Sequence, residues 1–98
     1  SKTMMITLEI LSRDSAFNNG LVRDVFSTSH ISINTGSIIS MSPARQGIKE
    51  VNGKSANNLS FTDIVYSMGS SVERITVLGE YHDLVSRVGK NSRRLLNG

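Results

Sequence analysis

The chain has 98 residues, which is enough for one domain with a single core. It contains no cysteine, which excludes disulfides and thiolate metal sites. Its formal net charge of +3 makes it mildly basic, without the dense basic stripe typical of a dedicated DNA-binding domain. We therefore expect residues 1–98 to form one small domain without a cofactor or a bound metal ion.

Two features of the sequence bear on its location. No apolar run approaches the roughly 18 residues that a membrane span requires. The N-terminus has no long apolar stretch followed by a small-residue cleavage site, so no signal peptide is visible. A chain without cysteine needs no adaptation to the reducing cytosol. We therefore expect a cytoplasmic protein that does not enter a membrane.

The first third of the chain predicts a strand followed by a helix. Residues 4–11 alternate, with apolar side chains at every second position, as in a strand that buries one face. Residues 12–19 are polar and typical of a turn. Asn19 or Gly20 then opens a short helix that ends near Ser29. The apolar residues of that segment follow helical spacing: Leu21, Val22, Val25 and Phe26.

The middle of the chain predicts extended structure with turns. Residues 31–41 are rich in isoleucine but interrupted by Asn34-Thr35-Gly36, which predicts either one interrupted strand or a short strand and a longer one. Residues 42–47 form a connection, and extended structure resumes over residues 47–51. Asn52-Gly53 then predicts a tight hairpin turn, because both residues tolerate positive φ.

The clearest helical pattern covers residues 61–68. Four apolar side chains recur at i, i+3, i+4 and i+7 and so share one stripe: Phe61, Ile64, Val65 and Met68. Ser60 and Asp63 resemble a capping box with Asp in place of Glu or Gln. Gly69 supplies a left-handed stop after the last turn. These residues predict a second helix.

The chain is expected to end with a strand over residues 74–78 and a helix over residues 81–96. The complete order is β-α-β-β-α-β-α. That order predicts an α+β fold, an open-faced β-sandwich in which a four-stranded, mainly antiparallel sheet carries its helices on one face.

Residues 52–79 also carry a family resemblance. The segment contains Asn52-Gly53-Lys54, a serine at position 60, an apolar stretch ending in Met68-Gly69, an Ile-Thr-Val strand and Gly79-Glu80. It resembles HPr, the small phosphocarrier protein of the bacterial phosphotransferase system, and its regulatory paralogues. The resemblance covers the C-terminal half and implies the same β-α-β-β-α-β-α order.

The N-terminal half departs from that family. HPr proteins carry a Gly-Leu-His-x-Arg-Pro motif, whose histidine accepts phosphate at a helix N-terminus. Here Gly20-Leu21 is followed by Val22 in place of the histidine, and Asp24 and Val25 stand in place of arginine and proline. The resemblance therefore implies an HPr-like regulatory domain and not a phosphohistidine carrier.

Ser60 and the terminal helix supply the candidate site residues. The resemblance implies that Ser60 is a regulatory phosphorylation site, because a phosphate there would meet free helix amides; the alternative is an ordinary N-cap. The terminal helix carries four cations: Arg87, Lys90, Arg93 and Arg94. These side chains could bind a nucleic-acid backbone or an acidic protein surface, or could form a solvated face.

No catalytic or metal-binding constellation is legible. His30 and His82 are lone histidines without ligand spacing to other acidic or sulfur side chains. We therefore expect a non-enzymatic, HPr-like regulatory or protein-interaction domain with a protein partner. Two alternatives remain open at this point: a small basic nucleic-acid-binding protein and a structural or assembly domain. The sequence leaves the oligomeric state open.

Overall fold

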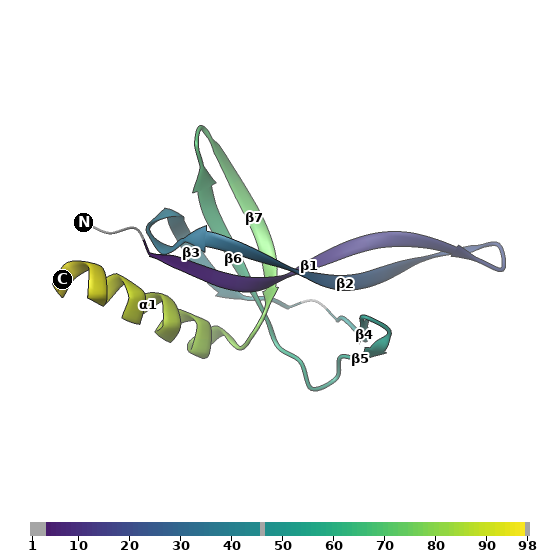
Figure 1. Cartoon of the computed structure of the whole chain (residues 1–98). Helices are drawn as coiled ribbons and strands as arrows, with labels where there is room; N and C mark the ends of the chain where they lie inside the picture. Colours follow the sequence, from purple (N-terminus) through teal and green to yellow (C-terminus); the bar gives the residue numbers. More distant parts are fainter. Residues whose placement is uncertain (1–3, 46, 98) are drawn as a thin grey trace.

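The computed structural model describes residues 4–45 and 47–97, with side chains described as far as Lys90. Its main feature is a five-stranded antiparallel sheet with the strand order β2-β1-β7-β6-β3 (Figure 1). The strands are β1 (Met5–Asn18), β2 (Leu21–Asn34), β3 (Ile38–Pro43), β6 (Phe61–Met68) and β7 (Ser71–Leu78). A 3₁₀ turn, η1 (Thr35–Ser37), joins β2 to β3. Strands β4 (Glu50–Val51) and β5 (Lys54–Ser55) form a separate small hairpin, and α1 (Tyr81–Asn97) ends the chain.

This architecture corrects the expected fold class. The α+β open-faced sandwich with the order β-α-β-β-α-β-α is wrong, because the described chain is dominated by strands and one α-helix, α1, packs against the sheet. Both of the earlier helices predicted from the sequence are strands. The terminal helix, the strand at residues 74–78 and the Asn52-Gly53 hairpin are confirmed.

The first correction concerns the segment predicted to be a helix after Asn19. Strands β1 and β2 pair continuously from Met5↔Asn34 to Asn18↔Leu21, with two residues between them. Asn19 and Gly20 have φ values of 52° and 78°, the two positive values of a type I′ turn. The right-handed twist of this turn matches the twist of the strands, so the chain continues as a long hairpin and not as a helix.

The second correction concerns residues 61–68, which form β6 over their whole length. Thr62, Ile64 and Tyr66 point to the helix-covered face of the sheet and are buried. Phe61 points to the opposite face and is buried there against other residues. Because both faces of this strand are partly covered, its apolar residues do not alternate cleanly, and the resulting spacing imitates that of a helix.

Two apolar clusters lie on the two faces of the sheet. The main cluster joins the sheet to α1 and consists of Ile6, Leu8, Ile33, Ile64, Tyr66, Val77 and Leu84. The smaller cluster lies under the β4–β5 hairpin and consists of Ile48, Val51, Ala56 and Phe61, with Leu11 and Phe26 packed against it. The second cluster therefore ties the small hairpin to the middle of the β1–β2 hairpin.

The outer part of the β1–β2 hairpin extends beyond the sheet. Strand β1 pairs with β7 through Ile10↔Val77, the one residue pair in their register. Beyond that point the two strands continue as a ribbon that projects to the right in Figure 1. We call residues 12–27 the arm. It accounts for the elongated shape of the described chain, whose principal extents are 57 × 31 × 19 Å.

The start of α1 is fixed by Glu80. Its carboxylate accepts a hydrogen bond from the backbone N–H of Asp83 at 3.0 Å and lies 2.8 Å from Nδ1 of His82. The backbone N–H and the ring of His82, followed by the backbone N–H of Asp83, hold the pKa of Glu80 below its ordinary value. Glu80 thus takes the capping role that a shorter polar side chain commonly fills.

Of the described helices, none combines the length and the apolar character that crossing a bilayer requires.

Replacing either of two glycines near α1 with alanine should change the stability of the fold, in opposite directions for the two positions. Gly79 has φ 140°, and an added Cβ would lie 2.9 Å from Cδ1 of the buried Leu84, so Gly79→Ala should destabilise the fold by about 1–3 kcal/mol. Gly89 lies inside the helix with no atom within 4 Å of an added Cβ, so Gly89→Ala should stabilise it by up to about 1 kcal/mol. Urea denaturation of the two variants measures both changes. Equal effects would contradict the different surroundings described for the two glycines.

Candidate functional site

The tip of the arm exposes large apolar side chains. Phe17 and Val22 are directly opposite each other on β1 and β2, so their side chains lie on the same face of the ribbon. Phe17 is 76% exposed and Val22 is 67% exposed. Leu21, on the other face, is 72% exposed. Isolated exposed apolar residues are ordinary, but a group of three at the end of a projecting ribbon is typical of an interaction site.

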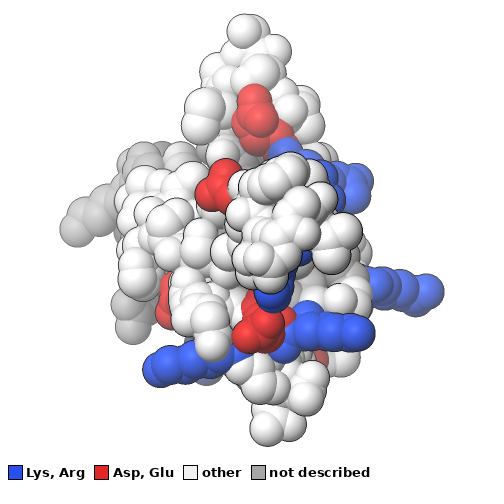
Figure 2. Space-filling model, turned by 90° about the vertical axis from the view of Figure 1, so that its right-hand side faces the viewer, with Lys and Arg blue, Asp and Glu red and all other residues white. Residues whose placement is uncertain are grey.

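The apolar tip is also free of charge. Residues 15–22 read Ser-Ala-Phe-Asn-Asn-Gly-Leu-Val. Farther down the arm, Arg13 and Arg23 are balanced by Asp14 and Asp24. Figure 2, which looks onto the tip end of the arm, shows an uncharged protrusion with basic and acidic side chains interspersed around it. A ribbon that tracks a phosphate backbone would instead carry an excess of cations.

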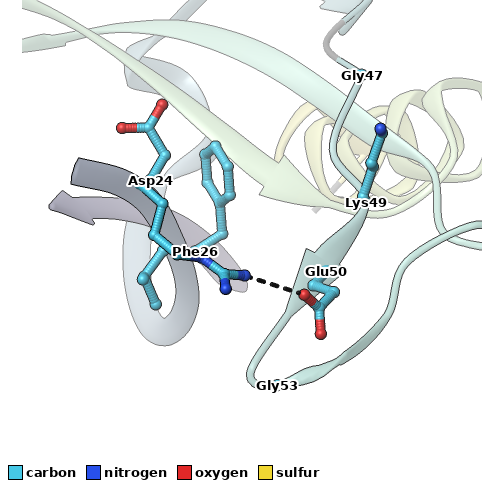
Figure 3. Close-up of a pocket in the computed structure, with 8 residues that line it drawn as sticks. Asp24, Phe26, Gly47, Lys49, Glu50 and Gly53 are labelled. Carbon is cyan, nitrogen blue, oxygen red and sulfur yellow. Dashed lines mark hydrogen bonds and ion pairs between the residues drawn. The ribbon is translucent and has the colours of Figure 1, made fainter. Parts of the chain in front are cut away.

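A cleft of about 360 Å³ lies where the arm meets the β4–β5 hairpin (Figure 3). Val25 and Phe26 contribute its apolar surface from β2. Its charged lining residues are two cations and two anions: Arg23, Asp24, Lys49 and Glu50. In the view of Figure 3, the ring of Phe26 lies between the side chains of Asp24 and Lys49. The cleft therefore combines an aromatic surface with a rim of zero net charge.

Asn52 holds the β4–β5 hairpin beside the arm. Its side-chain oxygen accepts from the backbone N–H of Thr28 at 3.1 Å, and its side-chain nitrogen donates to the Thr28 hydroxyl at 2.9 Å. Its backbone N–H donates to the carbonyl of Phe26 at 2.9 Å. Asn52 also has φ 55°, as the first residue of the hairpin turn requires. One residue thus makes the turn and attaches it to β2.

The ion pair between the arm and the β4–β5 hairpin contributes less to holding the hairpin. Arg23 Nη2 lies 3.4 Å from Glu50 Oε2, and both side chains are more than half exposed. Exposed pairs of this kind contribute about 0–1 kcal/mol. The position of the hairpin therefore depends mainly on the three Asn52 hydrogen bonds and on the apolar cluster beneath it.

Ser60 is exposed and precedes β6, not a helix. Its carbonyl accepts from the backbone N–H of Gly79 at 2.8 Å. The expected capping box is wrong, since Asp63 accepts a hydrogen bond from the Thr76 hydroxyl across the β6–β7 pair at 2.6 Å. Ser60 is therefore not the N-cap of a helix, although it lines a pocket together with Glu80 and Tyr81 at the start of α1. Modification of Ser60 stays a prediction.

The basic residues predicted on the terminal helix lie on α1, but the two whose side chains are described, Arg87 and Lys90, have different surroundings. Arg87 donates from Nη2 to the carbonyl of Thr7 at 3.4 Å, so it contacts the sheet, and Lys90 is exposed. The side chains of Arg93 and Arg94 lie outside the described residues. Nucleic-acid binding by this helix stays a prediction.

Neither histidine belongs to a metal site within the part of the chain that the structure describes, where no group of three or more potential ligands gathers. His30 Nε2 lies 4.0 Å from Glu9 Oε1 on the neighbouring strand. His82 contacts Glu80 at the helix start, as described above. Both contacts are exposed and pair one histidine with one carboxylate.

The arm residues and the cleft were not among the sequence candidates. Asn19-Gly20 between two segments with β-forming residues is the signal that could have found the arm, because a two-residue Asn-Gly loop is typical of a β-hairpin. Comparisons with protein-family models, with curated proteins and with solved structures each found no match for this chain. The candidate site therefore depends on its own geometry and chemistry.

Proposed function

We propose that this chain is a non-enzymatic assembly domain whose copies join through the arm. The observation that carries the proposal is the exposure of Phe17, Leu21 and Val22 at the uncharged end of a projecting β-ribbon. An isolated two-stranded ribbon has little stability of its own in water, and apolar residues at its end gain free energy only when another surface covers them.

The arm supports assembly better than it supports regulation through Ser60 or nucleic-acid binding. A regulatory role at Ser60 depended on Ser60 capping a helix, and the next residue, Phe61, begins strand β6 instead. A nucleic-acid-binding role would be supported by clustered cations on the arm, and the arm carries equal numbers of cations and anions. Assembly through the arm requires only the apolar tip and a surface on another copy that covers it.

Sedimentation velocity over a range of protein concentrations tests the proposal. The unaltered chain should show a rising mass with concentration, whereas the tip variant Phe17→Thr/Val22→Thr should remain monomeric over the same range. Threonine keeps the strand preference of the ribbon, removes the aromatic ring of Phe17 and replaces one methyl group of Val22 with a hydroxyl.

A matched control removes two exposed apolar side chains from a different hairpin. Met68 and Val72 lie near the turn between β6 and β7 and are both exposed. The variant Met68→Thr/Val72→Thr should assemble as the unaltered chain does. A monomeric unaltered chain at every concentration, or equal loss of assembly in both variants, would contradict an assembly function for the arm.

A further inference from the structure

We propose that the arm tip of one copy inserts into the cleft between β2 and the β4–β5 hairpin of a second copy, so that Phe17 and Val22 cover Phe26. This inference rests on the proposed assembly function and names the surface that receives the arm. Every copy carries both the tip and the cleft, so two copies of this chain supply both surfaces of the contact.

The apolar parts of the two surfaces match. The tip presents an aromatic and a β-branched side chain side by side, Phe17 and Val22. The cleft presents the aromatic ring of Phe26, while Val25, the next residue on the strand, points to the opposite face of β2 and lines another part of the cleft. A volume of about 360 Å³ is at the lower end of the roughly 300–1,000 Å³ of ligand-sized pockets, so it suits a few side chains better than a whole helix. Aromatic rings brought together in this way gain stabilisation beyond the area that they bury.

The polar parts of the two surfaces also match. The cleft's two cations and two anions give no net attraction to a strongly acidic or strongly basic segment. The tip is uncharged, and its amide side chains belong to Asn18 and Asn19. Each amide offers both a donor and an acceptor, so it can bond to a carboxylate such as Asp24 and to an ammonium such as Lys49. The charged residues of the cleft are therefore suited to bind an uncharged segment that contains amide side chains.

The tip cannot reach the cleft of its own chain. Val22 lies on the same strand as the cleft residues Arg23 and Phe26, and that strand is paired with β1 along its whole length. A paired strand advances about 3.3 Å per residue and does not fold back on itself. The contact must therefore form between two copies.

Mixing two variants, each with one lesion, tests this contact directly. The tip variant Phe17→Thr/Val22→Thr keeps an intact cleft. The cleft variant Gly47→Trp keeps an intact tip and adds a large side chain at a residue that lines the cleft, where an added Cβ meets no atom within 4 Å. Each variant alone should be monomeric in sedimentation velocity at concentrations where the unaltered chain assembles. Their equimolar mixture should form a 1:1 dimer, because one intact tip meets one intact cleft.

Two further proteins keep the test decisive. Lys49→Trp blocks the cleft from an exposed position, and it should behave as Gly47→Trp does even if the latter disturbs the chain locally. Asn58→Trp adds the same ring on an exposed turn that is not part of the cleft, and it should assemble as the unaltered chain does. Circular dichroism confirms that each variant is folded.

The outcomes separate this inference from the proposed function. Assembly of the unaltered chain, loss of assembly in the tip variant and a monomeric mixture would overturn the tip-to-cleft contact while leaving assembly through the arm intact. Assembly of the folded cleft variants at the affinity of the unaltered chain would overturn it in the same way. An unaltered chain that never assembles would overturn both.

Discussion

Replacing Ile64 with alanine is expected to lower the free energy of unfolding by about 2–5 kcal/mol. Ile64 is 0% exposed, lies in the middle of β6 and faces Met41 on β3 and Ile75 on β7. The loss combines the transfer free energy of the removed carbons with the cost of the cavity left behind. Since domains of this size have total stabilities of about 5–15 kcal/mol, this single change removes a large share of the fold's stability.

Val65→Ala is the matched control for this prediction. Val65 follows Ile64 on the same strand, points to the opposite face and is only half-buried. Its replacement should cost less than half as much as that of Ile64 in urea denaturation. If residues 61–68 formed a helix, Ile64 and Val65 would share one apolar stripe, and the two costs would differ by only about 0.8 kcal/mol, for the extra CH2 group of isoleucine. Equal costs would therefore contradict the strand.

The second large effect is expected at the arm tip. Fully burying a side chain such as Phe or Val contributes about 1.5–3 kcal/mol, so burying two contributes at most about 3–6 kcal/mol to assembly. Ordering the arm and desolvating polar neighbours consume part of that gain. We therefore expect Phe17→Thr/Val22→Thr to weaken assembly by about 100-fold, which corresponds to about 2.8 kcal/mol.

The same tip variant should leave the fold itself nearly unchanged. Phe17 and Val22 are exposed and belong to neither apolar cluster, and surface substitutions of this kind usually change stability by about 0.5 kcal/mol or less. Urea denaturation at a concentration where the chain is monomeric measures this. A loss of several kcal/mol would show that the tip packs within its own chain, contrary to the exposed arm described above.

The arm could have been predicted from its turn but not from its strands. Asn52-Gly53 and Asn19-Gly20 carry the same hairpin signal, but the apolar residues after Gly20 also fit helical spacing and so favour a helix there. Residues 12–18 are mostly polar, since the arm is solvated on both faces and no buried face imposes alternation. A turn motif was therefore more informative here than hydrophobic periodicity.

The β6 segment shows the opposite difficulty. Phe61 and Ile64 are buried on different faces of the sheet, in two different clusters, so apolar residues occur at spacings that a helix also produces. Its β-branched and aromatic residues, including Thr62 and Tyr66, were the better signal. The second cluster exists only because the β4–β5 hairpin folds over that face, a long-range event that no local pattern encodes.

The terminal helix was predictable because it needs only one partner surface. Leu84 is buried against the sheet and Val88 packs beside it, at the i, i+4 spacing of a single helical stripe. The cleft was not predictable, because it combines Phe26 of β2 with Lys49 and Glu50, which follow more than twenty residues later. Its formation depends on the hydrogen bonds between Asn52 and Thr28.

Protection of a cysteine at the arm tip tests the central claim most directly. The chain has no cysteine, so Val22→Cys introduces a single reactive thiol at the tip, and Ser70→Cys introduces one at the β6–β7 turn as a control. Assembly through the arm predicts that the labelling rate of Cys at position 22 falls as concentration raises the sedimenting mass, while the rate at position 70 stays constant. An assembled chain whose position-22 thiol reacts as fast as in the monomer would contradict burial of the arm tip.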